Sequence, residues 1–153
     1  MEDANSSGLK QIYVGDKEVV FREAVAEGYI KLRRETIERV ESKNVEKGDP
    51  LTLARLGGIA GSKYTPLLLP LCHNIRIEAV DVDAWIDKSS SRIGVRARVR
   101  AHEKTGVEME ALVAAMTALL NIWDMVKQYE KDERGQYPHT AVEFVRIVSK
   151  TKE

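Results

Sequence analysis

Asp124 and Lys127, near the end of a long apolar stretch, are of residue types that can move protons. Asp124 stands between Trp123 and Met125, and burial among such neighbours would shift the pKa of its carboxyl group toward general acid–base work. Lys127 follows three residues later, close enough on a helix to share the same end. The same spacing also suits an i,i+3 ion pair of little energetic value. A catalytic pair and a surface ion pair both remain open.

Lys47 precedes Gly48 and Asp49, just before a predicted helix. A lysine and free backbone amides in that position could hold a phosphate group. A lysine in a loop is more often simply solvated. An anion site at Lys47 is therefore one of two interpretations.

The segment Leu71-Cys72-His73-Asn74 enters a predicted strand, where rigid scaffolds often display functional side chains. From composition alone, His73 is more often a surface residue or a satisfied one. Cys72 and His73 are adjacent, so in a strand they would point to opposite faces and not form a nucleophile–base pair. The sequence lacks the CxxC and HExxH spacings of metal sites, so we expect no metal and no cofactor.

Glu108, Met109 and Glu110 open residues 105–127, which are predicted to form one long helix capped by Thr105. The helix dipole is a sufficient explanation for acidic residues in a first turn. Apolar residues on nearly every side of the stretch are typical of a core helix. One polar line nevertheless follows it, formed by Glu110, Thr117, Asn121, Asp124 and Gln128. Such a line either pairs with cations or lines a cleft.

The composition limits the class of protein. The 153 residues suit a single domain, expected at residues 10–153 after a loose tail at 1–9. The single cysteine, Cys72, cannot form an internal disulfide, which favours a reducing cytoplasm. No secretory signal is expected at the N-terminus, and no apolar run is expected to cross a membrane.

The charges argue against nucleic acid as a partner. There are 24 basic and 24 acidic residues, so no net field draws the chain to a polyanion. Arg96, Arg98 and Arg100 would share one strand face, but Asp83 and Asp81 are expected opposite the first two. That face is also expected to carry no aromatic residues on which bases could stack.

The remaining patterns predict a mixed α+β fold. Helices are expected at residues 35–41 and after Pro50, with Asp49 as the cap. The prolines at 66 and 70 are expected to end that helix and extend the chain. Strands are expected at residues 11–14, 19–32, 75–87, 92–103 and 140–150. Val142, either Phe144 or Val145, and Ile147 are candidates for the inner face of the last strand.

The firmest prediction is a hairpin of residues 75–87 and 92–103. Pairing Ile86 with Ile93 brings apolar partners together on one face and opposite charges on the other. The alternation slips at residues 79–80, where we expect a bulge. With its helices on one face of a mainly antiparallel sheet, the chain should adopt a ferredoxin-like plan.

Several segments together resemble the MoaC family, the cyclic pyranopterin monophosphate synthases of molybdenum-cofactor biosynthesis. They are Arg22-Glu23-Ala24-Val25-Ala26-Glu27-Gly28, Lys47-Gly48-Asp49, Ala54-Arg55-Leu56-Gly57-Gly58-Ile59, Leu69-Pro70-Leu71-Cys72-His73, Lys104 to Leu112 and Asp124-Met125-Val126-Lys127. The Thr-Gly-Val-Glu-Met-Glu-Ala-Leu run and the Pro-Leu-Cys-His run are the most specific. The resemblance extends from about residue 22 to residue 127.

The resemblance implies an activity. The substrate would be 3′,8-cyclo-7,8-dihydroguanosine 5′-triphosphate, derived from GTP, and the products cyclic pyranopterin monophosphate and pyrophosphate. It implies that Asp124, Lys127 and Lys47 are catalytic. It further implies a substrate pocket formed by Leu71, Cys72, His73, Glu108, Met109, Glu110 and Arg22. The family forms homohexamers, trimers of dimers, with each site shared between two subunits.

The sequence departs from the family pattern in two places, and one other interpretation of its function remains. The family often begins with Met-Val-Asp-Val where this chain has Gln11-Ile12-Tyr13-Val14, and often ends in a lysine- and glycine-rich tail that is missing here. The rival interpretation is a non-catalytic, nucleotide-binding oligomer with a regulatory role. Leu67-Leu68-Leu69 and the glycine-rich residues 57–61 favour a buried subunit interface in either case.

Overall fold

The computed structural model describes residues 8–153, and most of the predicted tail at 1–9 lies outside that range. The elements, in chain order, are β1 (Val20–Lys31), α1 (Arg34–Glu41), α2 (Pro50–Ser62), α3 (Thr65–Leu68), β2 (Ala79–Asp87), η1 (Lys88–Ser90), β3 (Arg92–Glu103), α4 (Glu108–Glu130) and β4 (Ala141–Lys152).

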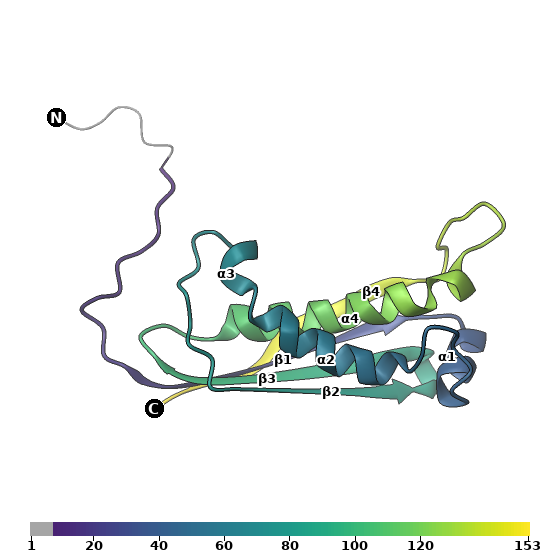
Figure 1. Cartoon of the computed structure of the whole chain (residues 1–153), viewed down its shortest axis with the longest axis horizontal. Helices are drawn as coiled ribbons and strands as arrows, with labels where there is room; N and C mark the ends of the chain where they lie inside the picture. Colours follow the sequence, from purple (N-terminus) through teal and green to yellow (C-terminus); the bar gives the residue numbers. More distant parts are fainter. Residues whose placement is uncertain (1–7) are drawn as a thin grey trace.

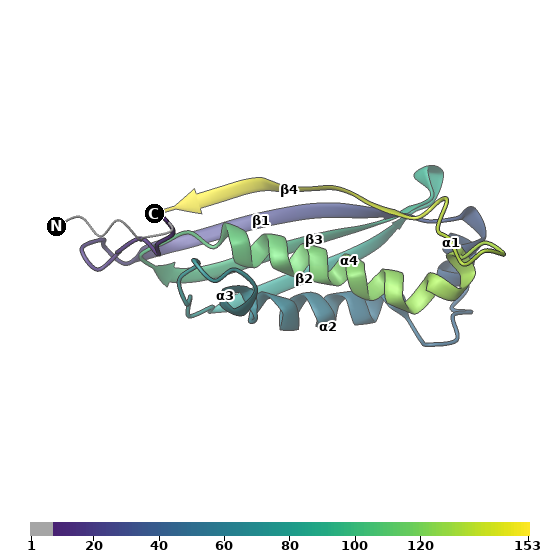
Figure 2. The same cartoon turned by 90° about the horizontal axis from the view of Figure 1, so that it is seen from above.

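The four strands form one antiparallel sheet in the order β2-β3-β1-β4. The long helices α2 and α4 lie side by side along one face of it (Figures 1 and 2). This arrangement confirms the predicted ferredoxin-like α+β fold. Within residues 8–153, no helix covers the other face of the sheet. Helix α3 lies near the beginning of α4, whereas α1 lies at its far end (Figure 2).

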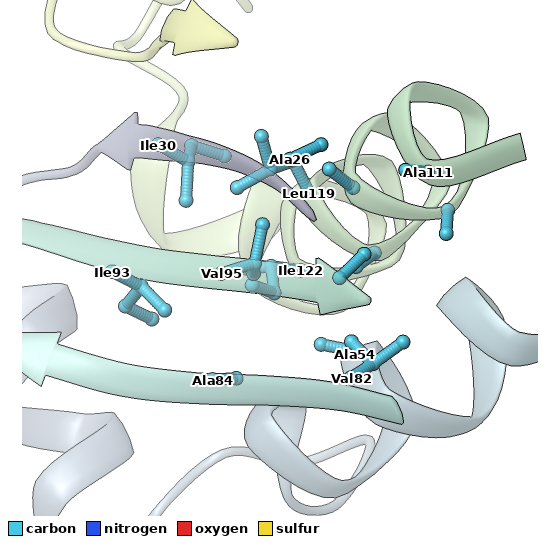
Figure 3. Packing of buried hydrophobic residues seen from close by; sticks show 14 of the residues in the cluster. Ala26, Ile30, Ala54, Val82, Ala84, Ile93, Val95, Ala111, Leu119 and Ile122 are labelled. Carbon is cyan, nitrogen blue, oxygen red and sulfur yellow. The ribbon is translucent and has the colours of Figure 1, made fainter. Parts of the chain in front are cut away.

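The core fills the space between the sheet and the two long helices (Figure 3). Alternate residues of β1 and β3 point into it, among them Ile30, Ile93 and Val95, all fully buried. Helix α4 contributes Leu119 and Ile122. By length and composition α4 could cross a membrane, but half of the relevant window is buried within the fold. We therefore assign α4 as the core helix of this domain.

The β2–β3 hairpin has the predicted register. Ile86 pairs with Ile93, Ala84 with Val95 and Val82 with Ala97, without the bulge expected at residues 79–80. β2 begins at Ala79, four residues later than predicted. The regular alternation of β3 is sufficient to fix the pairing. The break in the alternation at residue 79 marks the first residue of β2 and not a bulge within it.

The helix-free face of the sheet differs from prediction in two ways. Asp83 and Asp81 do lie opposite Arg96 and Arg98, as predicted. The two arginines nevertheless form their ion pairs with Glu27 and Glu23 of β1, because β3 lies between β1 and β2 and its side chains reach either neighbour. Aromatic rings are also present there. The Arg96 guanidinium lies 6.0 Å from the ring centroid of Trp85. The expectation of a face without aromatic residues was wrong.

Three local predictions near the ends of elements were also wrong. Residues 11–14 form no strand: the Gln11 side chain and the Ile12 carbonyl bond to residues 72 and 73, and the Val14 carbonyl accepts from the Lys17 amide in a turn. Pro66 does not extend the chain: it lies in the first turn of α3, where its missing N–H costs nothing. Thr105 does not cap α4, whose N-cap is Val107 and has no side-chain hydrogen bond.

The end of the chain pairs with β1 through an irregular register. The sheet shifts register between Glu27 and Tyr29, where Phe144 adopts a positive φ of 57° and is exposed. Val145, not Phe144, therefore packs toward the core. A Cβ on Gly28 would lie 2.7 Å from Val145 Cγ2, so the bulge requires glycine at position 28.

Helix α2 packs closely on α4 through its glycines. A Cβ on Gly61 would lie 2.5 Å from Thr117 Oγ1 and 2.6 Å from Thr117 Cβ, whereas one on Gly57 would meet only the amide end of Asn121. The glycine-rich segment is thus used inside the chain, and it does not require the subunit interface that we had predicted for it. The middle of the polar line on α4 is a helix-packing surface.

Gly61→Ala should lower the free energy of unfolding by about 1–3 kcal/mol, because the rigid Cβ of Thr117 cannot move aside. Gly57→Ala is the matched control and should cost much less, since the Asn121 side chain can turn aside about χ1. Chemical denaturation of both variants measures the difference. Equal effects of the two substitutions would contradict this account of α2–α4 packing.

Candidate functional site

Asp124, Lys127 and Lys47 come together near the C-terminal end of α4. Lys127 Nζ lies 3.0 Å from Asp124 Oδ1, and Lys47 Nζ lies 3.6 Å from Oδ2. Lys47 also donates a 2.9 Å hydrogen bond to the backbone carbonyl of Asp124. The structure therefore brings together all three residues predicted to be catalytic, with two cations on one carboxylate.

Asp124 is not buried, contrary to prediction. Its side chain is 62% exposed, because it lies on the outer line of α4 while Met125 points into the core. The hydrogen bond from Lys127 and the charges of Lys127 and Lys47 hold the pKa of Asp124 below its usual value. The same contact raises the pKa of Lys127. In this chain Asp124 is ionised and Lys127 is protonated near neutral pH.

The loop before α2 holds Lys47 in place. Gly48, with a φ of +121°, turns the chain, and the Asp49 side chain then accepts a hydrogen bond from the Leu51 amide to cap α2. On the other side, the amide of Glu46 donates to Tyr129 Oη at 3.0 Å. Lys47 is therefore fixed between a helix cap and α4.

The other predicted residues gather near the beginning of α4. Glu108 forms an ion pair with Lys150 of β4, whose Nζ lies 2.5 Å from Oε1. Burial favours a higher pKa for Glu108, but the hydrogen bond and charge of Lys150, helped by the charge of Arg22, lower it overall. Arg22 is buried and donates to the Lys104 carbonyl at 3.1 Å.

Lys150 is not among the residues predicted from the sequence. It lies in β4 opposite Ala24, so strand pairing carries it to the site from the far end of the chain. Antiparallel pairing of the last strand with β1 could have indicated Lys150, because such pairing places residue 150 near residue 22.

Glu110 is a buried carboxylate without a full set of partners. The residue is only 3% exposed, and its Oε2 atom has no hydrogen-bond partner among the described residues. Burial, with the charge of Glu108 adding to it, raises the pKa of Glu110 to about 7. Burial and the nearby Glu110 also raise the pKa of the Cys72 thiol. Cys72 and Glu110 are therefore close enough for the charge of one to act on the other.

His73 is in contact with the N-terminal segment. Its Nε2 lies 2.5 Å from the carbonyl oxygen of Ile12, and Gln11 donates to the carbonyl of Cys72 at 2.9 Å. Lys104 reaches the same segment at the Gly15 carbonyl. Leu71, two residues before His73, is 46% exposed, and Met109, in the first turn of α4, is 39% exposed. A ligand that binds His73 through Nε2 must displace the Ile12 carbonyl.

The two groups of residues lie at opposite ends of one helix. Fourteen residues separate Glu110 from Asp124 on α4, which is roughly 20 Å at 1.5 Å per residue. One chain therefore does not bring its predicted site residues into a single pocket. Residues 8–153 also contain no group of three or more His, Cys, Asp or Glu side chains that could hold a metal ion.

Comparison with known proteins assigns the chain to a family. The model of the MoaC family matches residues 11–153, nearly the whole chain. The chain belongs to the MoaC family. A protein from Sulfurisphaera tokodaii named probable cyclic pyranopterin monophosphate synthase is 54% identical to it over 143 residues, covering 94% of this chain and 93% of the relative. Relatives with the same name from Saccharolobus solfataricus and Pyrococcus horikoshii are 52% and 50% identical over 97% of this chain, covering 98% and 92% of their own lengths.

The raised pKa of Glu110 in this MoaC chain predicts a pH effect on stability. With a folded pKa of about 7 against 4.5 unfolded, the folded state binds more protons between these values. Glu110 should therefore make unfolding easier as pH rises from 4.5 to 7, and its effect should level off above that. Glu108 and Asp124 have lowered pKa values, so their ionisation makes the fold more stable as pH rises. That effect falls below pH 4.5, outside the window in which Glu110 acts.

Glu110→Gln removes this titration. The melting temperature of the variant minus that of the wild type should increase from pH 4.5 to 7 and then stay constant. A series of thermal melts at fixed ionic strength measures it. A difference that is the same at every pH would contradict the assignment.

Proposed function

We infer that the protein is a cyclic pyranopterin monophosphate synthase of molybdenum-cofactor biosynthesis, a lyase. Its substrate is 3′,8-cyclo-7,8-dihydroguanosine 5′-triphosphate, which it rearranges with release of pyrophosphate. The membership of the family and the names of the relatives support this function. The observation in the structure that carries it is the contact of Lys47, Asp124 and Lys127, because the reaction needs proton transfer beside a highly anionic ligand.

In this proposal Asp124 and Lys127 exchange protons with the ring of the substrate. Exposed as it is, Asp124 is a weak base, since two cations stabilise its ionised form. Exclusion of water by a bound ligand and a second subunit would raise the pKa of Asp124 toward the working pH. Lys127, protonated and hydrogen-bonded to Asp124, is placed to donate a proton. Lys47 would balance the negative charge of the substrate.

The remaining pocket would come from the opposite end of another copy's α4. Arg22, Lys150 and His73 supply cations or hydrogen-bond donors for phosphate groups, and Glu110 supplies a carboxyl group for ring nitrogens. Leu71, Cys72 and Met109 would form its apolar walls, and Glu108 would hold Lys150. Because these groups lie roughly 20 Å from Asp124 in one chain, the proposed site is shared between two subunits.

We propose a homohexamer, a trimer of dimers, as the assembly. Apolar side chains on the outside of the chain support a subunit interface. Leu67 and Leu68 of α3 are 77% and 60% exposed, and Met116 and Leu120 are exposed on α4. We also propose a cytoplasmic location, which suits the free thiol of Cys72. Binding to nucleic acid or to a membrane forms no part of the proposal.

Turnover of the cyclised triphosphate by the purified full-length chain tests the function. Pyrophosphate and the cyclic pyranopterin should appear in equal amounts. Calorimetry with the same ligand distinguishes the rival, a regulatory nucleotide-binding module. Tight binding without product would support that rival and overturn the proposed activity.

A further inference from the structure

A polar hollow lies one helical turn beyond Asp124. It has a volume of about 630 Å³ and lies between the end of α1, the loop after it and the last turns of α4. Its lining residues are Arg39, Lys43, Asn44, Val45, Glu46, Gln128 and Tyr129. None of them was predicted to be a site residue. Glu46 and Gln128 are the sequence neighbours of Lys47 and Lys127, so the hollow adjoins the proposed catalytic cluster.

The Arg39 guanidinium is fixed in this hollow. It lies 4.4 Å from the centroid of the Tyr129 ring, and Nη1 donates to the Asn44 carbonyl at 3.2 Å. Tyr129 is itself held by the Glu46 amide. An arginine held against a ring presents its remaining N–H groups in a set direction, which suits recognition of phosphate oxygens.

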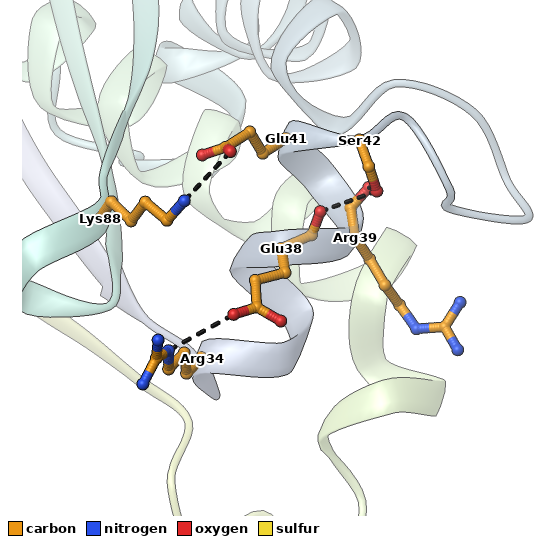
Figure 4. A network of polar contacts seen from close by, with 6 residues as sticks. All are labelled: Arg34, Glu38, Arg39, Glu41, Ser42 and Lys88. Atoms are coloured by element: carbon orange, nitrogen blue, oxygen red, sulfur yellow. Dashed lines mark hydrogen bonds and ion pairs between the residues drawn. The ribbon is translucent and has the colours of Figure 1, made fainter.

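The carboxylates of α1 do not neutralise Arg39. Figure 4 shows Glu38 directed to Arg34 and Glu41 directed to Lys88, with Arg39 pointing away from both. Among residues 8–153, Arg39 and Lys43 form no ion pair.

Glu46 carries the only carboxylate that lines the hollow in the described part of the chain, and this carboxylate accepts a hydrogen bond from Gln128 at 3.2 Å. Two unpaired cations therefore face one carboxylate that already has a partner, and the hollow favours an anion.

We propose that this hollow is a diphosphate subsite. Arg39 and Lys43 bind the diphosphate group that the reaction releases, at the end of the catalytic cluster formed by Lys47, Asp124 and Lys127. The assignment rests on the proposed function for its ligand, because a diphosphate is the leaving group of that reaction. The cations themselves are a property of the chain and can be tested without turnover.

Titration calorimetry of the full-length oligomer with sodium pyrophosphate tests the subsite. Arg39→Gln and Lys43→Gln should each weaken pyrophosphate binding by about tenfold, as expected for the loss of one charge-assisted contact. Arg34→Gln is the matched control, since it removes a cation of the same helix that lies outside the hollow, and binding should not change. Inorganic phosphate should bind more weakly than pyrophosphate to the wild type.

Equal pyrophosphate affinity in the wild type, Arg39→Gln and Lys43→Gln would overturn the subsite. Inhibition of turnover by pyrophosphate gives a second measure, with the inhibition constant rising in both variants and not in Arg34→Gln. Failure of the proposed function has a different signature. It would leave the wild type without turnover, while the calorimetric difference between Arg39→Gln and Arg34→Gln persisted.

Discussion

Asp124→Asn should lower turnover of the cyclised triphosphate by about 10²- to 10⁴-fold, the range for loss of a general acid–base group. Asparagine keeps the size of the side chain and can still accept a hydrogen bond from Lys127, but it cannot take up a proton. The side chain of Asp124 is mostly exposed, so the substitution leaves the core untouched. Product formation, measured as pyrophosphate release, should fall while the fold is preserved.

The control for Asp124 is an aspartate elsewhere on the surface. Asp83, exposed on the helix-free face of the sheet, forms no ion pair among the described residues. Asp83→Asn should turn over at the wild-type rate. Circular dichroism and light scattering of both variants verify fold and assembly. Wild-type turnover in a correctly assembled Asp124→Asn variant would remove Asp124 from the mechanism.

Glu130→Ala should lower the free energy of unfolding by about 3–5 kcal/mol, because it leaves buried polar groups without partners. Glu130 is fully buried at the last turn of α4. Its carboxylate accepts from the Arg33 amide at 3.1 Å, from Thr140 Oγ1 at 2.8 Å and from Thr36 Oγ1. These contacts join α1, the end of α4 and the segment that leads into β4.

The loss should appear as a fall in melting temperature of about 10 °C for a chain of this size. Glu133→Ala is the matched control, since Glu133 is exposed in the following turn, and it should change the melting temperature little. Equal melting temperatures for Glu130→Ala and the wild type would show that these hydrogen bonds add nothing to stability.

Glu130 also shows what the sequence could not provide. It begins the run Glu-Lys-Asp-Glu-Arg-Gly-Gln, and charge patterning predicts a solvated turn for all of it. Burial of Glu130 depends on donors from residues 33, 36 and 140, which are distant in the sequence. A local pattern carries no information about such partners.

The hairpin of β2 and β3 was predictable because its information is local. Strand alternation and the short connection fix the register of Ile86 and Ile93. Asp124 shows the limit of the same reasoning. Its sequence neighbours Trp123 and Met125 suggested burial, but on a helix adjacent residues point about 100° apart, so apolar neighbours do not bury a residue. Spacing alone correctly placed Lys127 beside it.

The length of the predicted helix was enough to show, from the sequence, that the two ends of α4 lie far apart. The sequence did not show which residue forms an ion pair with each end of the helix. Lys47 reaches Asp124 across a loop, and Lys150 reaches Glu108 through the return of β4 along β1. Both contacts depend on tertiary structure, so a resemblance to a family could suggest Lys47 while nothing in the local pattern pointed to Lys150.

Complementation between two inactive variants tests the shared site most directly. Asp124→Asn and His73→Ala, each carrying its own affinity tag, should be inactive alone. Co-expressed and purified through both tags, they should regain turnover, because a mixed pair retains one site with an intact Asp124 from one chain and an intact His73 from the other. Mixed oligomers with no more activity than the separate variants would mean that each site lies within a single chain, which contradicts the account.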